Sequence, residues 1–290
     1  MAAKRDATDL QSRIDLCWGA LQNNNPVDAG RWLAEVLRAD PENGQALLVR
    51  AEMLRRRGEL EEAVKYWQRG FKNGANDFDS RIRCGDTMLK LGNAGGAIDQ
   101  WQRAKACWPS CTEQQTSPEL RLARLYRDQG ERTQAQMEMK SYCRRTARAF
   151  TPRYTLAEFE KEAGNRKGEL QFLIECNRID PFYRELHVRM GEAYEALARI
   201  PEAALEFEVA AAVSPDADRA YMRPNAQKPA SDSEEELRAR GQLWLRAARL
   251  RHKLGDSERR DSLVERVLQE ARVTELQTEA RDLQQEWRGK

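Results

Sequence analysis

Small residues recur at a constant spacing among the apolar and polar positions of this chain. Cys17, Ala51 and Gly85 are separated by intervals of 34 residues. After a four-residue insertion the same interval separates the next three small residues, and a seventh follows a longer insertion. A fixed period of this length is typical of stacked supersecondary units. We call these the reference residues of seven copies of one repeat: Cys17, Ala51, Gly85, Ala123, Ala157, Gly191 and Ala248.

Three further positions recur in each copy. Seven residues after the reference residue is a glycine in five copies, and five positions later is an alanine in five copies. The two small residues let two helices cross closely, and the glycine between them permits the left-handed turn that reverses the chain. A large apolar residue follows one helical turn after the second small residue and fills the gap beside the next copy. The pattern predicts seven helical hairpins with these large residues in the core: Leu33, Trp67, Trp101, Met139, Leu173, Phe207 and Val264.

The ten prolines support this division into helices. A proline inside a helix costs about 3 kcal/mol, but the first turn tolerates it. Pro26 and Pro201 fall where second helices are predicted to begin, and Pro118 and Pro152 where first helices begin. The other six lie between copies or in the long insertion, so no proline interrupts a predicted helix.

A period of 34 residues with this spacing resembles the tetratricopeptide repeat family. Two copies carry the pattern best; they contain Gly85, Met88, Gly92, Ala97, Trp101, Ala104 and Pro109, and Gly191, Tyr194, Ala203, Phe207, Ala210 and Pro215. The resemblance implies an all-α, right-handed α-solenoid of about seven hairpins with a C-terminal capping helix. Glu169 and Arg260 depart from it, because they occupy positions that are small in the other copies.

The copies and insertions predict the organisation of the chain. The insertion Thr112-Glu113-Gln114-Gln115 lengthens one turn. In the longer insertion, Tyr221-Met222 is either a docking motif or part of an ordinary loop, and Ser233 is either a helix cap completed by Glu236 or a phosphorylation site. We expect an N-terminal extension (1–9), six repeats (10–217), a flexible loop (218–235), a degenerate seventh repeat (236–272) and a capping helix (273–290).

Composition narrows the classes of function. The chain has 49 basic and 47 acidic residues and a formal net charge of +2, which argues against a dedicated nucleic-acid binder. No apolar run is long enough to span a membrane, and no signal peptide is visible behind Lys4 and Arg5. The six cysteines fall mainly at helix-packing positions, which suits a reducing compartment. We therefore expect a cytoplasmic protein.

No arrangement of residues predicts catalysis or a metal site. His187 and His252 are the two histidines, and neither has a catalytic partner at a recognisable spacing. Cys107 and Cys111 form the one close cysteine pair, and no second pair or nearby histidine completes a zinc site. The glycine-rich segment 92–96 lacks the lysine and hydroxyl residue of a nucleotide-binding loop. We expect no enzyme activity, cofactor or metal.

In the tetratricopeptide repeat family the first helices of the copies line a concave surface that binds peptides or partner proteins. A carboxylate-binding clamp known in the family is not expected here, because only Arg83 matches it. Trp18 is either a ligand anchor or buried by a neighbouring helix. The charges of the predicted groove either orient an extended partner, with one half basic and the other acidic, or are simply solvated. The resemblance implies these groove residues: Trp18, Glu52, Arg55, Arg56, Asp86, Lys90, Arg124, Arg127, Tyr154, Glu158 and Glu192.

The function predicted on this basis is a non-catalytic adaptor or scaffold that binds a peptide or partner protein in the groove. The first alternative is a self-assembling scaffold, in which the degenerate ends or the last helix pair with another copy of the chain. RNA binding by helical repeats is a further alternative that the near-neutral charge disfavours.

Overall fold

The computed structural model describes residues 2–213 and 233–288, and these residues form fifteen α-helices and no strand. The all-α prediction is confirmed. The chain divides into two compact units, residues 1–145 and 146–290, which we call the first and second unit. The predicted docking motif Tyr221-Met222 and most of the predicted loop 218–235 lie outside the described residues.

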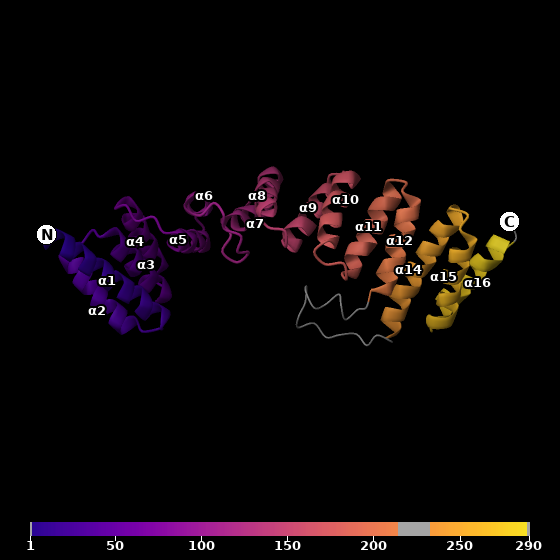
Figure 1. Ribbon diagram of the computed structural model, residues 1–290, viewed down its shortest axis with the longest axis horizontal. Helices are drawn as coiled ribbons and strands as arrows, with labels where there is room; N and C mark the ends of the chain where they lie inside the picture. The colour runs from indigo at the N-terminus through magenta and orange to yellow at the C-terminus, as the bar shows by residue number, and fades with distance from the viewer. Residues whose placement is uncertain (1, 214–232, 289–290) are drawn as a thin grey trace. The chain divides into compact units, whose positions relative to one another are not determined.

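The first unit consists of four helical hairpins, in which each odd-numbered helix packs against the next even-numbered one (Figure 1). Its helices are α1 (Ala2–Gln22), α2 (Pro26–Ala39), α3 (Gly44–Arg56), α4 (Leu60–Lys72), α5 (Phe78–Lys90), α6 (Ala94–Cys107), α7 (Pro118–Asp128) and α8 (Arg132–Arg145).

The described residues of the second unit form three hairpins and a final single helix. Helix α16 packs on both α14 and α15 and buries Leu276 and Ala280, as expected of a capping helix. The helices are α9 (Phe150–Glu162), α10 (Arg166–Asn177), α11 (Arg184–Ala196), α12 (Ile200–Ala212), α14 (Glu234–Lys253), α15 (Ser257–Glu270) and α16 (Thr274–Arg288).

The chain reverses within each hairpin through one residue with a positive φ. All seven of these residues lie at the predicted turn position, seven residues after the reference residue. Five are glycines, and the others are Asn24 and Ala198, with φ of 54° and 57°. Alanine rarely adopts this conformation, so the backbone at Ala198 is held there by the helices on either side.

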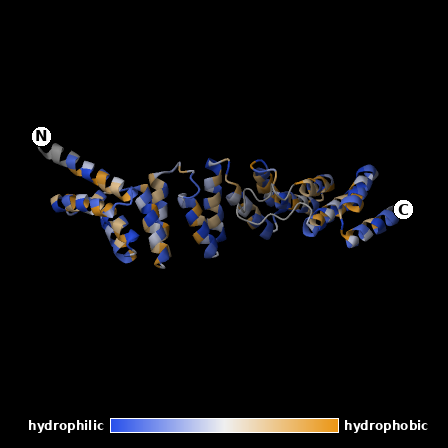
Figure 2. Ribbon diagram, turned by 90° about the horizontal axis from the view of Figure 1, so that it is seen from below, coloured by the Kyte–Doolittle hydropathy of each residue, from blue (hydrophilic) through white to orange (hydrophobic). Residues whose placement is uncertain are grey.

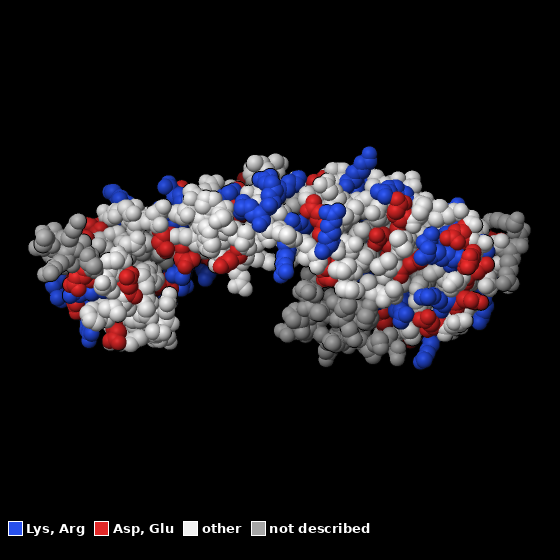
Figure 3. Space-filling model, in the orientation of Figure 1, with Lys and Arg blue, Asp and Glu red and all other residues white. Residues whose placement is uncertain are grey.

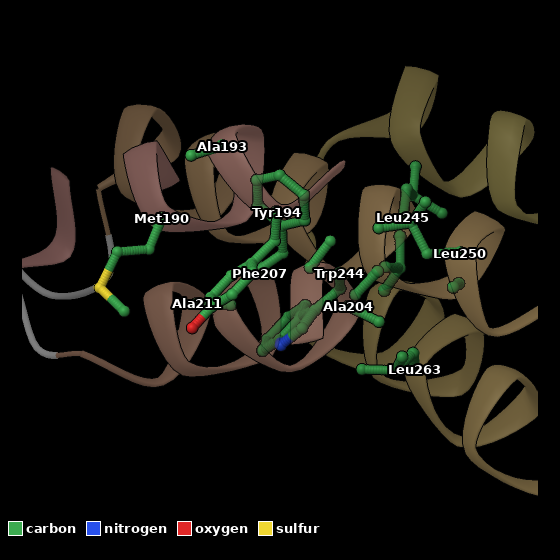
Figure 4. Close-up of a cluster of buried hydrophobic side chains, with 14 of the residues drawn as sticks. Met190, Ala193, Tyr194, Ala204, Phe207, Ala211, Trp244, Leu245, Leu250 and Leu263 are labelled. Carbon is green, nitrogen blue, oxygen red and sulfur yellow. The ribbon is translucent and has the colours of Figure 1, made fainter. Parts of the chain in front are cut away.

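The small reference residues permit close helix packing, as predicted. A Cβ atom at Gly85 would come within 2.5 Å of the indole nitrogen of Trp101, and one at Gly191 would come within 2.8 Å of the ring of Phe207. Trp67, Trp101 and Phe207 are almost completely buried, so the core role predicted for them is confirmed. Figure 4 shows Phe207 in the core of the second unit, beside Tyr194 and near Trp244.

Most helices are amphipathic and turn their apolar residues toward neighbouring helices. Figure 2 shows hydrophobic and hydrophilic residues on opposite sides of many of them. Glu169, which occupies a position that is small in other copies, is buried in the second unit and paired with Arg166 and Arg189. The ion pairs compensate for burying its charge, so the repeat keeps its register there.

Helix α14 begins at a side-chain cap, but not at a complete capping box. The hydroxyl of Ser233 accepts a hydrogen bond from the backbone N–H of Glu236, as predicted. The predicted return bond from the Glu236 carboxylate is replaced, because this carboxylate accepts two hydrogen bonds of 2.7 Å from Arg184 on α11. The Ser233 cap is thus kept, and the second bond of the capping box is replaced by an ion pair between α14 and α11.

Candidate functional site

Ion pairs connect the first helices of successive copies at a recurring pair of positions. The carboxylate lies one residue after the reference residue, and its arginine lies two residues before the reference residue of the next copy. This ladder of ion pairs was not foreseen from the sequence. Its members, with their N–O distances, are Glu52–Arg83 (3.9 Å) and Asp86–Arg121 (2.8 Å) in the first unit, and Glu158–Arg189 (3.8 Å) and Glu192–Arg246 (3.5 Å) in the second.

The ladder is interrupted at the fourth copy. Arg124 on α7 occupies the position where the carboxylate is expected, and Thr155 occupies the arginine position of the fifth copy. No ion pair involving Arg124 is present among the described residues, and its side chain is exposed. Arg124 is therefore a cation without an ion-pair partner at a position where four other copies place a carboxylate that is paired with an arginine.

Glu52 was predicted to face a partner, but the structure buries it. Its carboxylate accepts hydrogen bonds of 2.8 Å from Arg55 and Arg56, and Arg83 lies 3.9 Å away. Burial alone would raise the pKa of Glu52, but these hydrogen bonds and the charge of Arg83 outweigh it and lower the pKa below its usual value. Glu52 is thus an internal counter-charge for three arginines and is not available to a partner.

A hollow of about 1190 Å³ opens beside α5 and α7 in the first unit, and we call it the groove. The four-residue insertion after Cys111 lines one part of it, through Glu113, Gln114 and Gln115. Apolar lining comes from Leu60, Leu89, Leu120 and Leu125. The charged lining residues are Arg55, Arg83, Lys90, Arg121, Arg124, Asp86, Glu113 and Asp128.

Three of the five cations in the groove are already paired. Arg55 and Arg83 share Glu52, as described above. Arg121 donates hydrogen bonds of 2.8 and 3.1 Å to Asp86 and a third of 2.8 Å to the backbone carbonyl of Gln115. Lys90 and Arg124 are exposed and have no ion-pair partner among the described residues.

The structure brings together only some of the predicted groove residues. Arg55, Asp86, Lys90 and Arg124 line the groove. Arg56 instead binds Glu52 and the backbone carbonyl of Leu21, and Arg127 is exposed on α7 outside the lining, near Asp128. Arg121 lines the groove but was not among the predicted groove residues. The sequence feature that could have identified it is the position two residues before the reference residue. That position is arginine in four copies: Arg83, Arg121, Arg189 and Arg246.

Trp18 is half-buried rather than freely presented. Its side chain packs against two apolar clusters of the first unit, one centred on the first hairpin and one on the hairpins that follow. Among the two interpretations of Trp18, this placement favours packing within the repeat.

The predicted groove residues of the second unit are drawn into internal contacts. Tyr154 stacks on Phe150 with a ring-centroid distance of 5.8 Å, and the guanidinium of Arg189 lies 4.4 Å above its ring. Burial raises the pKa of the Tyr154 hydroxyl, despite the opposing effect of Arg189. Glu158 and Glu192 both belong to the ion-pair ladder, so the acidic half of the predicted groove is largely neutralised.

The charges on the surface differ between regions of the chain. On the face shown in Figure 3, Lys and Arg side chains gather over α8, whereas acidic and basic side chains are interspersed over α14 and α15. Helix α8 contains Arg132, Lys140, Arg144 and Arg145. Arg145 is bound to the buried Glu119, so part of this basic surface is compensated internally.

The histidines are engaged in packing, and five of the six cysteines are buried, Cys107 being half-buried. The buried ring of His187 contacts Glu206 through Nδ1 at 2.7 Å and the carbonyl of Pro181 through Nε2 at 2.8 Å. His252 stacks on Trp287 at a centroid distance of 4.8 Å. Within the described ranges there is no cluster of three or more His, Cys, Asp or Glu residues suited to a metal ion. None of the described helices has the length and hydrophobicity needed to cross a membrane.

Comparisons with known proteins identify the fold. No protein-family model and no curated protein matches the chain. Among solved structures, the C-terminal part of a TPR repeat-containing protein from Cytophaga hutchinsonii is 14% identical, with a TM-score of 0.55, over 89% of this chain and 95% of that one. A chain in the structure of Naa15/Naa10 bound to HypK-THB is also 14% identical, with a TM-score of 0.56, over 90% of this chain and 36% of that one. The repeat geometry and these similarities together show that the chain has the fold of the tetratricopeptide repeat proteins.

Proposed function

We propose that this protein is a non-catalytic interaction scaffold and that its groove binds an extended segment of a partner protein. The observation that carries this proposal is the groove itself. Its volume of about 1190 Å³ exceeds the range of roughly 300–1,000 Å³ usual for small-molecule pockets. Helices provide most of its lining, and sites built on helices are more rigid than those on loops.

The chemistry of the groove supports binding rather than catalysis. Its hydroxyl groups are committed to the protein, because Thr87 donates to the carbonyl of Arg83 and the buried Ser117 donates to Glu119. Its remaining ionisable groups are arginines, a lysine and carboxylates, and the carboxylate of Asp86 is bound by Arg121. The lining contains no pair of a nucleophile and a base of the kind that covalent catalysis requires.

Photo-crosslinking tests the proposal directly. A photoreactive amino acid replaces Leu89, which lines the groove and is 39% exposed, or Met137, which is 65% exposed on α8 and does not line it. We expect irradiation in native lysate to give a discrete product from the Leu89 position that is lost in a Lys90→Glu/Arg124→Glu background. Identical products from both positions, or products that persist in that background, would contradict binding in the groove.

Self-assembly is a second candidate that one observation favours. Leu16 and Val27, on the first hairpin, are 50% and 79% exposed. In the described residues this hairpin is packed on one side only, against α3, and no helix covers its other side as α16 covers α14 and α15. Light scattering over a range of concentrations tests this: a self-assembling chain shows a concentration-dependent mass that Leu16→Lys/Val27→Lys abolishes, whereas a constant monomer mass eliminates the candidate.

A further inference from the structure

We propose that the groove selects an internal partner segment in which acidic side chains alternate with apolar ones, and that Lys90 and Arg124 bind the acidic side chains. This inference rests on the proposed function and names the chemistry of its partner.

The ion-pair ladder is interrupted at Arg124. In the neighbouring copies, Glu52 and Asp86 supply a carboxylate at the position that Arg124 occupies. Arg124 therefore places a positive charge where these copies place a carboxylate that is paired with an arginine. A carboxylate from a partner would give Arg124 an ion-pair partner, and a guanidinium can bind a carboxylate through two parallel hydrogen bonds.

The cations of the groove differ in whether they already have an ion-pair partner. Arg55, Arg83 and Arg121 are held by Glu52 and Asp86, so an incoming carboxylate would have to compete with existing ion pairs. Lys90 and Arg124 require no such exchange. They lie on different helices, α5 and α7, and line one groove, which suits two acidic side chains of one segment better than a single terminal carboxylate.

The carboxylates and the buried indole in the lining of the groove favour a peptide over a nucleic acid. Asp86, Glu113 and Asp128 also line the groove, so a phosphate backbone, which carries a charge at every nucleotide, would place some of its charges beside carboxylates, whereas a peptide can place apolar side chains there. Trp101, the one aromatic lining residue, is 2% exposed and offers no face for a base to stack on. The exposed Leu89, and Leu120, which also lines the groove, instead offer apolar contacts to side chains between the acidic ones.

The experiment measures peptide binding to the full chain by fluorescence anisotropy. The probes are a labelled peptide of alternating glutamate and leucine, a lysine–leucine peptide of the same length, and single-stranded polyuridylate. The peptide ends are acetylated and amidated to remove terminal charges. We expect the acidic peptide to bind, with an affinity that falls as salt rises, and the other two probes to bind at least tenfold more weakly.

Charge-reversal variants locate the site. We expect Arg124→Glu and Lys90→Glu each to weaken binding of the acidic peptide about tenfold or more, as loss of a charged hydrogen bond implies. Arg127→Glu makes the same charge change one turn along α7 outside the groove lining and should have a much smaller effect. The Arg124→Glu variant should also bind the lysine–leucine peptide more tightly than the original protein does. Circular dichroism verifies that each variant is folded.

Three outcomes would overturn the inference: no binding of the acidic peptide, equal losses from Arg124→Glu and Arg127→Glu, or tighter binding of polyuridylate. Crosslinking of a partner at Leu89 without any preference for acidic peptides would overturn this inference and leave the scaffold function standing. The absence of crosslinking at Leu89 would count against the proposed function itself.

Discussion

Asp86 on α5 binds Arg121 on α7 through two hydrogen bonds of 2.8 and 3.1 Å, and the same carboxylate accepts a third bond, of 3.2 Å, from the indole of Trp101. This arrangement connects three structural features: the core of one hairpin, the next hairpin and the lining of the groove. It follows that changes to either residue should affect the stability of the first unit as well as binding.

A double-mutant cycle at this pair tests the importance of the ladder for stability. We expect Asp86→Ala and Arg121→Ala each to lower the free energy of unfolding by about 1 kcal/mol, with a coupling energy of at least about 0.5 kcal/mol. The side chains are 38% and 23% exposed, so solvent screening keeps the effect below that of a buried pair. Urea denaturation measures it. The control is Arg103–Asp99, a pair within α6 that is more exposed; an equal or larger coupling there would contradict the prediction.

The contact between Gly85 and Trp101 predicts a large cost for adding one methyl group. Gly85→Ala places a Cβ 2.5 Å from the indole nitrogen of Trp101, so the buried indole or one of the helices must shift and stability should fall by about 2 kcal/mol. Gly19→Ala is the control, because no atom lies within 4 Å of its Cβ and its φ is not positive. Since alanine favours helix, we expect Gly19→Ala to stabilise the protein by up to about 1 kcal/mol. Thermal denaturation that ranks the two variants in the reverse order would contradict this packing.

The buried carboxylate of Glu52 predicts a dependence on acid pH. The pKa of Glu52 is lowered in the folded protein. The ionised carboxylate therefore contributes to the free energy of unfolding above the unfolded pKa of about 4.5, and this contribution is lost as pH falls through the lower pKa of the folded state. We expect Glu52→Gln to lower the free energy of unfolding by about 2 kcal/mol at pH 7, because its arginines are only partly buried. The difference between the two proteins should shrink below pH 4.5. Denaturant titrations at several pH values measure it, and a difference that is constant with pH would count against the prediction.

His187 predicts the opposite dependence in the second unit. Burial would lower its pKa, but hydrogen bonds to Glu206 and to the carbonyl of Pro181, and the nearby charge of Asp180, outweigh burial and raise it. A raised pKa stabilises the fold fully below the unfolded value of 6.5, and this stabilisation is lost as pH rises through the folded pKa. The stability of the original protein should therefore fall above pH 6.5 relative to that of His187→Gln. Parallel pH profiles of the two proteins would show that His187 does not titrate in this way.

Some of the candidate site could be read from the sequence and some could not. Lys90 and Arg124 were placed in a groove because the resemblance assigns first-helix positions to it, and both line the hollow. The burial of Glu52 was not foreseen, because it depends on three arginines, one of them 31 positions away on the next first helix. The insertion after Cys111 was read as a longer turn, and only the structure shows that it lines the groove.

The sequence by itself determined the hairpins, their turns and their tight contacts, because each of these depends on residues within one copy. The spacing of Gly85, Gly92 and Trp101 is enough to specify a helix contact, a chain reversal and a buried indole. Tertiary structure alone decided which charges neutralise one another, since ion pairs such as Asp86–Arg121 form between copies. Lys90 and Arg124 have no ion-pair partner among the described residues, because no carboxylate of a neighbouring helix lies within ion-pair distance of either side chain.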